Sequence, residues 1–261
     1  MSTENNLNIE FKNLKNKEPI LVTYLPAGYP DKRTSIKWAK TLLKNGADAV
    51  ELGYPSPSPD RDGHIISKAQ TEVLKNGFAP EDYLEIIGEI NAETQFNRII
   101  LMGYWDQFRE TPGDSFLEKV GQAGVKNLIF PDLSEEKELG NLVGRGFEVT
   151  PFLETFESLS FYSRNTGSFV YCPTYHGKTG KDLDIEVDFL NELKEKLDES
   201  HLKGKPHLAG FGIRRKDDVE KVIRLGFDGI VVGSAVLKAF SGSQEAGLSL
   251  LEELKAGLRE E

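Results

Sequence analysis

A short unit recurs along this chain: the end of a helix-like segment, a glycine, and a short apolar run typical of a buried strand. The clearest copies pair a glycine with the run after it at Gly124 and 128–130, Gly146 and 149–153, and Gly226 and 229–232. Glycine at a helix end indicates a left-handed cap, and such apolar runs indicate strands buried on both faces. Strands that alternate with helices pair in parallel through right-handed crossovers.

The number of these units predicts the architecture. We count eight strand-like runs, at 20–25, 49–52, 98–104, 128–130, 149–153, 168–173, 206–211 and 229–232. Helix-like segments lie at 34–44, 80–90, 114–122, 134–143, 158–165, 187–199 and 216–224. Eight strand-like runs that alternate with these helix-like segments in 261 residues predict an α/β fold, a (β/α)₈ TIM barrel. A doubly wound open sheet is the competing fold, but no Gly-x-Gly-x-x-Gly follows the first run.

The repeating pattern bears on domain organisation, because a linker between domains would interrupt it. No Gly-, Ser- or Pro-rich linker divides the chain, so we expect a single TIM-barrel domain over 1–261. Residues 1–18 are polar and Asn-rich, which predicts a lead-in before the fold begins. No apolar run approaches the roughly 18 residues of a membrane span.

Charge and cysteine content narrow the partners and the compartment. The 42 acidic and 32 basic residues give a net charge of −10, which disfavours nucleic acid and anionic membrane as partners. The single cysteine, Cys172, cannot form an internal disulfide and lies in an apolar run, so we expect a buried, inert thiol. No secretory leader is recognisable at the start, and we therefore expect a cytoplasmic protein.

Two carboxylates follow the second strand-like run. Glu51 lies near the end of the apolar run 49–52, and Asp62 closes the proline-rich loop beyond it. The active site of a barrel is built at the C-terminal ends of its strands, where both residues fall. Burial of an unpaired carboxylate raises its pKa, as a general acid or base requires near neutral pH. The alternative is that Glu51 is a half-buried strand-end residue paired with a Lys or Arg.

Glycine-rich turns follow the last three strand-like runs, at 176–180, 209–212 and 232–235. Barrels often bind phosphate there with backbone N–H groups and the N-terminus of a short helix, so these turns predict a phosphate site. Lys178 is a further candidate contact, although a solvated loop lysine is the more ordinary interpretation. His64 is a candidate base but more often such a residue is simply exposed. The remaining histidines show no ligand spacing, so we predict no metal site.

These residues match a known family. The most specific part is Gly-Ala-Asp-Ala-Val-Glu-Leu-Gly-Tyr-Pro at 46–55, followed by Asp62-Gly63, with Gly-Phe-Gly-Ile at 210–213 and Gly-Ser-Ala at 233–235. From 19 to about 238 the chain resembles the alpha subunits of tryptophan synthase. These are (β/α)₈ barrels that cleave indole-3-glycerol phosphate to indole and glyceraldehyde 3-phosphate.

The resemblance implies roles for individual residues. Glu51 would be the general acid/base that protonates the indole carbon, and Asp62 would hold the indole N–H and stabilise the positive charge on the ring. No cofactor is implied, and the implied protein partner is a tryptophan synthase beta subunit. The implied indole slot consists of Tyr24, Met102, Tyr104, Ile129, Tyr171 and Phe211, with Tyr171 supporting Glu51; most of these would otherwise be core residues. The implied phosphate ligands are Gly180, Gly212, Gly233 and Ser234.

Several loops depart from the family pattern. The usual Thr-Ala-Gly-Asp-Pro is Pro-Ala-Gly-Tyr-Pro at 26–30, Phe-Ser-Asp-Pro is Ser-Pro-Ser-Pro at 56–59, and His64 replaces a proline. The loop at 174–180 lacks the usual arginine, and we expect 175–183 to be mobile without ligand.

These loops bear on partner signalling more than on basal chemistry. Both carboxylates remain, which favours a lyase. The alternatives are a non-catalytic relative that binds an indole, a sugar phosphate or a partner subunit, and a barrel lyase or isomerase acting on another phosphorylated substrate.

Overall fold

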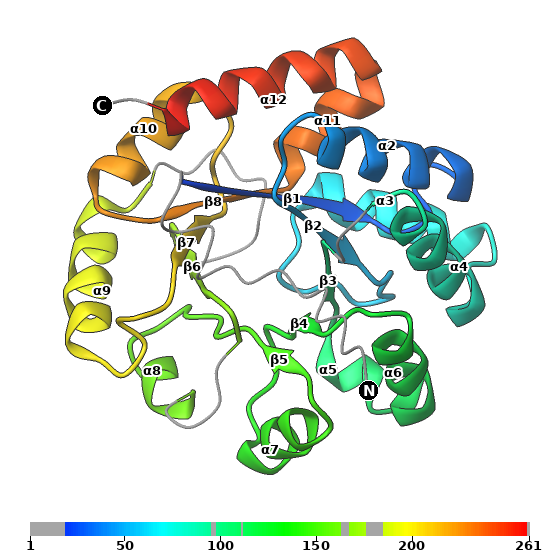
Figure 1. Cartoon of the computed structure of the whole chain (residues 1–261), viewed down its shortest axis with the longest axis horizontal. Helices are drawn as coiled ribbons and strands as arrows, with labels where there is room; N and C mark the ends of the chain where they lie inside the picture. The colour runs from blue at the N-terminus through cyan, green and yellow to red at the C-terminus, as the bar shows by residue number, and fades with distance from the viewer. Residues whose placement is uncertain (1–18, 95–97, 111, 163–166, 176–184, 260–261) are drawn as a thin grey trace, which may run out of the picture.

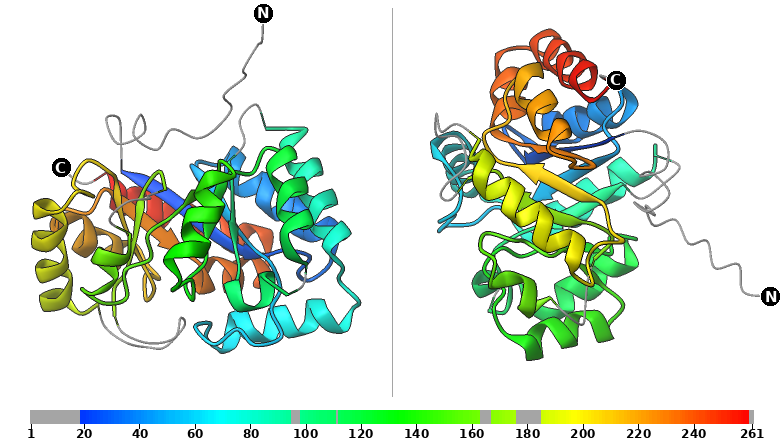
Figure 2. Two further views of the ribbon diagram at one scale, coloured as in Figure 1. Left: turned by 90° about the horizontal axis from the view of Figure 1, so that it is seen from below. Right: turned by 90° about the vertical axis from the view of Figure 1, so that its left-hand side faces the viewer.

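The computed structural model describes residues 19–94, 98–110, 112–162, 167–175 and 185–259. Their strands form one parallel sheet in the order β5-β4-β3-β2-β1-β8-β7-β6, and the helices surround it (Figure 1). The side views show the helices at the periphery and the strands crossing the middle (Figure 2). The strands are β1 Ile20–Pro26, β2 Ala49–Gly53, β3 Ile99–Met102, β4 Asn127–Ile129, β5 Glu148–Val149, β6 Val170–Pro173, β7 His207–Gly210 and β8 Gly229–Val232. The predicted TIM barrel is confirmed.

The two ends of the sheet meet through a short parallel bridge. Phe152, beyond the end of β5, bridges Tyr171 of β6. Leu153 N–H donates to the Tyr171 carbonyl at 3.0 Å, and Tyr171 N–H donates to the Pro151 carbonyl at 2.8 Å. The strand predicted at 149–153 is therefore mostly this bridge, and the regular ladder of β5 is shorter than predicted.

The helices agree with the sequence in most places. Helices α9 and α10 have the predicted bounds, whereas α3, α5 and α12 were not predicted, and α8 is shorter than the predicted 158–165. The helices are α2 Lys32–Lys44, α3 His64–Lys75, α4 Pro80–Asn91, α5 Trp105–Phe108, α6 Gly113–Gln122, α7 Glu136–Gly144, α8 Ser158–Phe161, α9 Val187–Glu199, α10 Lys216–Arg224, α11 Ser234–Gly242 and α12 Gln244–Leu258.

Helix α2 begins two residues earlier than the sequence predicted. Thr34 was expected to begin the helix, but Asp31 is the N-cap, and its carboxylate accepts from Thr34 N–H at 2.9 Å. Aspartate three residues before a threonine satisfies the exposed amide of the first turn. The glycine caps predicted at Gly124, Gly146 and Gly226 are confirmed, because all three have positive φ, between 84° and 91°, and Gly46 after α2 has a φ of 108°.

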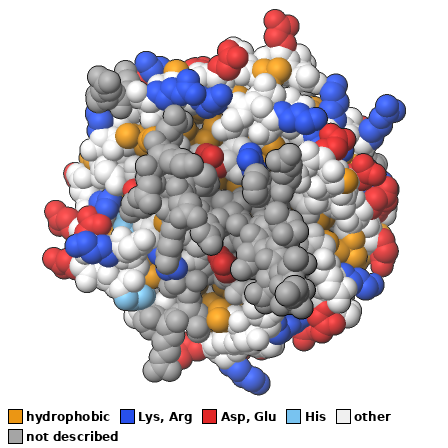
Figure 3. Space-filling view, in the orientation of Figure 1, with side chains coloured by type: hydrophobic (Ala, Val, Ile, Leu, Met, Phe, Trp, Pro, Cys, Tyr) orange, Lys and Arg blue, Asp and Glu red, His pale blue; other side chains and the backbone are white. Residues whose placement is uncertain are grey.

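The strands supply much of the buried core of the protein. All seven residues of β1 are buried, as expected for a strand covered on both faces. Cys172 in β6 is fully buried and burial raises its pKa, as expected for an inert thiol. None of the described helices combines the length and the apolar character that a membrane span requires. Acidic and basic side chains are interspersed around the rim of the face shown in Figure 3.

Candidate active site

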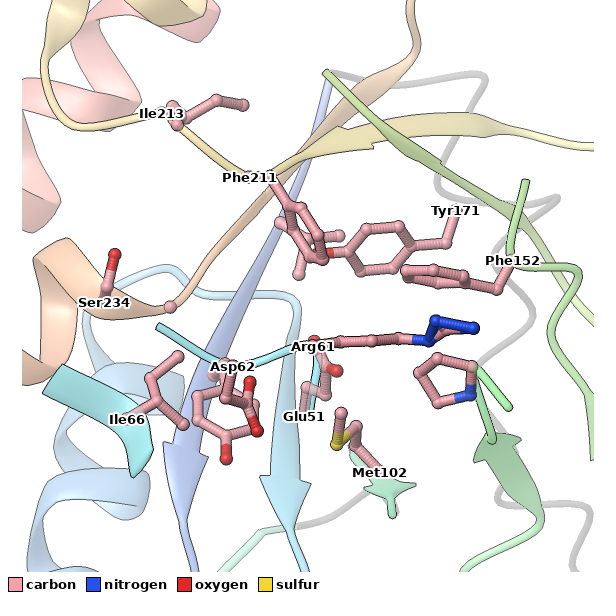
Figure 4. Close-up of a pocket in the computed structure, with 15 residues that line it drawn as sticks. Glu51, Arg61, Asp62, Ile66, Met102, Phe152, Tyr171, Phe211, Ile213 and Ser234 are labelled. Atoms are coloured by element: carbon pink, nitrogen blue, oxygen red, sulfur yellow. The ribbon is translucent and has the colours of Figure 1, made fainter. Parts of the chain in front are cut away.

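A cavity opens at the C-terminal ends of the strands, where a barrel places its active site (Figure 4). The cavity is narrow, with a volume of about 40 Å³, and the space reaches about 570 Å³ only when the open solvent at its mouth is included. The lining residues come from the ends of strands and the loops that follow them. They are Tyr24, Glu51, Arg61, Asp62, Ile66, Met102, Pro131, Phe152, Tyr171, Phe211, Gly212, Ile213, Val231, Gly233 and Ser234.

Glu51 is held inside this cavity by β2. The strand is buried along its whole length because β1 and β3 pair with its two edges, and Glu51 is only 4% exposed. Burial, and secondarily the charge of Asp62, raises the pKa of Glu51 to about 8. A carboxyl group with this pKa keeps its proton at neutral pH and can act as a general acid. The alternative considered for Glu51 from the sequence was a half-buried ion pair; Glu51 is instead fully buried, and among the described residues no Lys or Arg acts on its pKa.

Asp62 reaches the same cavity from the loop between β2 and α3. It is 5% exposed, and its Oδ2 accepts hydrogen bonds from Gln70 Nε2 at 2.7 Å and from the Tyr104 hydroxyl at 3.0 Å. Hydrogen bonds donated to a carboxylate favour its charged form. The fold thus brings the two predicted carboxylates together in different surroundings.

The expected slot residues divide into three groups. Met102, Tyr171 and Phe211 line the cavity with Tyr24, whose pKa is raised by burial, so that its hydroxyl stays protonated. Tyr104 touches Asp62 but lines a neighbouring cavity with Tyr54, Ser56 and Asp132.

Ile129 is the third case. It is buried in β4 opposite Met102 in the register, and it is a core residue that is not among those lining the cavity.

Phe211 is presented to the cavity by a left-handed turn at the end of β7. Its φ is 72°, an uncommon value for a residue with a side chain, and Gly212 follows with φ 67°. Thr174 stabilises the turn, because its N–H donates to the Gly210 carbonyl and its hydroxyl donates to the Phe211 carbonyl, both at 2.7 Å. The turn places the Phe211 ring edge-on to Tyr171 with centroids 6.0 Å apart.

Three of the four predicted phosphate residues lie in the same cavity. Gly212, Gly233 and Ser234 line it together, and Gly233 is the N-cap of α11, whose first residue is Ser234. Backbone N–H groups at a helix N-terminus and in a glycine turn favour an anion. Gly180 lies outside the described residues, as do Lys178 and all of the loop expected to be mobile except Tyr175.

Sequence reasoning missed several functional candidates. Arg61, Ile66, Pro131, Phe152, Ile213 and Val231 also line the cavity. Arg61 runs across it in Figure 4 and pairs with Glu154 at 2.9 Å. Its position directly before Asp62 is the one signal that pointed to it. Gln70 was missed because α3 was not predicted.

His64, a candidate base from the sequence, and Asp132, which follows β4, lie outside the cavity lining. His64 is exposed at the first position of α3. Asp132 accepts from Trp105 N–H at 2.7 Å and from Asp106 N–H at 3.0 Å, so its carboxylate caps α5. Among the described residues no three His, Cys, Asp or Glu side chains gather as a metal site.

Comparison with known proteins identifies the family. The model of the family described as "Tryptophan synthase alpha chain" matches residues 11–260. The tryptophan synthase alpha chain of Trichormus variabilis is 32% identical over 260 residues, 95% of each chain. That of Aquifex aeolicus is 33% identical over 261 residues, 96% of this chain and 98% of the relative.

Solved structures are also similar to this chain over nearly its whole length. One from Aquifex aeolicus has a TM-score of 0.84 at 30% identity and covers 98% of this chain and 99% of that chain. A chain of tryptophan synthase from Mycobacterium tuberculosis has a TM-score of 0.83 at 27% identity, with 98% of both chains covered. The resemblance read from the sequence is confirmed, and this chain belongs to the tryptophan synthase alpha chain family.

Proposed function

We propose that this chain cleaves indole-3-glycerol phosphate to indole and glyceraldehyde 3-phosphate, with Glu51 and Asp62 as the catalytic residues. One observation carries the assignment. Two buried carboxylates share a cavity with an aromatic wall of Phe152, Tyr171 and Phe211. The glycine turn and the start of α11 lie in the same cavity. An indole and a phosphate joined by a short chain match these surroundings.

Glu51 can both donate the proton that the cleavage needs and accept the proton that it releases. Its pKa of about 8 leaves it protonated at neutral pH, so it can deliver a proton to C3 of the indole. The carboxylate formed then takes the hydroxyl proton from the glycerol chain as the bond between that chain and C3 breaks. The electron pair of this bond returns to the ring, an aldehyde forms, and Glu51 regains its proton.

Asp62 complements the charge that the first step creates. Protonation of C3 places positive charge on the ring nitrogen, and a carboxylate that accepts the ring N–H stabilises it. Asp62 accepts its hydrogen bonds from Gln70 and Tyr104 in the structure without substrate. A preorganised acceptor loses little energy to reorganisation during the reaction.

The phosphate would bind backbone N–H groups of Gly212, Gly233 and Ser234, with Gly180 as a further ligand expected from the sequence. The helix dipole of α11 adds to this attraction. Binding there would anchor the flexible glycerol chain and hold the indole over Glu51.

The proposal also includes a protein partner and a cellular compartment. A tryptophan synthase beta subunit would receive the indole in a hetero-oligomer. A cytoplasmic location is supported by the phosphorylated substrate and by the single, buried cysteine, which suits a reducing compartment.

The test is indole release from indole-3-glycerol phosphate by the purified protein, with and without a beta subunit. We expect release by the native chain, a loss on the order of 10²–10⁴-fold in Glu51→Gln, and stimulation by the beta subunit. Folded protein that binds the substrate but releases no indole would support the non-catalytic alternative. Release from a different phosphorylated compound alone would support the third.

A further inference from the structure

The amide of Gln70 lies in the interior beside the Asp62 carboxylate. Gln70 projects from α3 and is 1% exposed. Its Oε1 accepts from Ser56 N–H at 2.8 Å, and its Nε2 lies 2.7 Å from Asp62 Oδ2 and 3.2 Å from the Tyr24 hydroxyl. One side chain thus connects the loop after β2, a strand residue of β1 and the candidate catalytic carboxylate.

The orientation of this amide is fixed by its partners. A backbone N–H can only donate, so the Gln70 atom that faces Ser56 must be the carbonyl oxygen. The NH₂ group then faces Asp62, and the contact is a donated hydrogen bond to a carboxylate. Both the identity and the direction of the bond follow without an assumption about amide flips.

We propose that Gln70 is a positioning residue for Asp62, which sets the direction of its carboxylate for the ring nitrogen of the substrate. This inference rests on the proposed function. Gln70 and Tyr104 donate to the same oxygen from different elements, α3 and the segment between β3 and α5. Two donors from separate elements fix the rotation of the carboxylate, which one donor alone would leave free to swing.

The length and neutrality of glutamine both matter at this position. Asparagine is one methylene shorter and cannot span the distance between Ser56 and Asp62 from the same helix position. Glutamate would present a carboxylate oxygen to Asp62 at about the same distance, where two charges repel.

Other ionisable groups also face the Asp62 carboxylate. They are Tyr24 of β1, Glu51 of β2, Tyr104 and Tyr171 of β6, and Arg61 lines the same cavity. Among these, Tyr24 also loses its hydrogen bond from Gln70 in a Gln70 variant, but burial raises the pKa of Tyr24, so it stays neutral and a shift in the titration of Asp62 would report the lost donor.

Two variants and one matched control test the proposal. Gln70→Met keeps the size and removes the donor, Gln70→Glu keeps the shape and changes the charge, and Ser67→Ala is the control. Ser67 lies on the same helix and donates to the main-chain carbonyl of Asp62 at 3.1 Å, away from its carboxylate.

The measurements are the pH profile of kcat/KM for indole release and a ¹³C-carboxyl NMR titration of the ligand-free protein, with Asp62 assigned from Asp62→Asn. In Gln70→Met we expect the acid limb and the Asp62 midpoint to rise by about one pH unit, because a carboxylate that loses a donor holds its proton more tightly. Gln70→Glu should shift both further, and Ser67→Ala should shift neither.

The outcomes separate this inference from the proposed function. An Asp62 midpoint unchanged in folded Gln70→Met and Gln70→Glu would overturn the positioning role, even if activity fell. A native chain that releases no indole would overturn the proposed function. The NMR titration in the ligand-free protein would still show whether Gln70 holds the Asp62 carboxylate.

Discussion

Glu51 and Asp62 face one cavity, but Asp62 Oδ2 accepts hydrogen bonds from Gln70 and Tyr104, whereas the pKa of Glu51 is raised by burial. The same pair therefore offers a proton donor and a charged acceptor at one pH. A reaction that must protonate a ring carbon and stabilise the resulting cation uses both. The two carboxylates differ in their surroundings because Glu51 projects from the buried strand β2, whereas Asp62 lies in the loop between β2 and α3.

The pH profile of the native enzyme should report Glu51. The free enzyme needs Glu51 protonated, and its pKa is about 8, so kcat/KM for indole release should fall tenfold for each pH unit above about 8. The check is the profile of kcat/KM from neutral to alkaline pH, with substrate stability measured separately. A profile that stays flat well above this pH would contradict the role of Glu51 as the acid.

The buried Glu51 should also lower the free energy of unfolding of the native chain at neutral pH. Its pKa is about 8 in the folded state against 4.5 for the free side chain, so the unfolded chain ionises first and the free energy of unfolding falls as pH rises from 4.5 to 8. Glu51→Gln removes this ionisation and should be about 2–3 kcal/mol more stable than the native chain at pH 7.

The two proteins should be nearly equal in stability near pH 4.5, where the native Glu51 is protonated in the fold. Urea unfolding at both pH values measures the difference. Equal stability at pH 7 would mean that Glu51 is not buried as an unpaired carboxyl group.

The sequence predicted what depends on local pattern. Gly46 and Gly226 mark helix ends because a positive φ favours glycine wherever it occurs. Glu51 was found because a carboxylate inside an apolar strand is conspicuous. By contrast, α3 begins at the N-cap Gly63 without a side-chain cap, so no start signal marks it. Its residue Gln70 was missed with it.

Other features depend on contacts between distant segments. The closure of the barrel by Phe152 and Tyr171 joins two segments whose local patterns do not specify the partner. Ile129 and Met102 are neighbours in the sheet and equally apolar, yet only Met102 is among the residues that line the cavity. The direction in which a core side chain points is set by the barrel as a whole.

Gly212 should be sensitive to a single methyl group. Its φ is 67°, and a Cβ there would lie 2.8 Å from Tyr175 Cε1. Gly212→Ala should lower stability by about 1–2 kcal/mol and raise the KM for substrate about tenfold, because the phosphate turn must shift.

Gly242→Ala is the matched control, since nothing lies within 4 Å of its Cβ at the end of α11. Steady-state kinetics and urea unfolding of the two variants give the comparison. If Gly212→Ala bound substrate as well as the control does, the turn would not be part of the phosphate site.

Asp132 should matter for folding more than for chemistry. Its carboxylate accepts from the N–H groups of Trp105 and Asp106 at the start of α5, and its loss leaves these two amides without that acceptor. We expect Asp132→Ala to lose about 1–2 kcal/mol of stability and to keep the pH profile of the native chain. Asp106→Ala is the control, because that side chain is 76% exposed and its ion pair with Arg109 should contribute less than about 1 kcal/mol. Thermal unfolding and the pH profile of indole release measure both variants; a displaced alkaline limb in Asp132→Ala would show that Asp132 acts on the proton transfer itself.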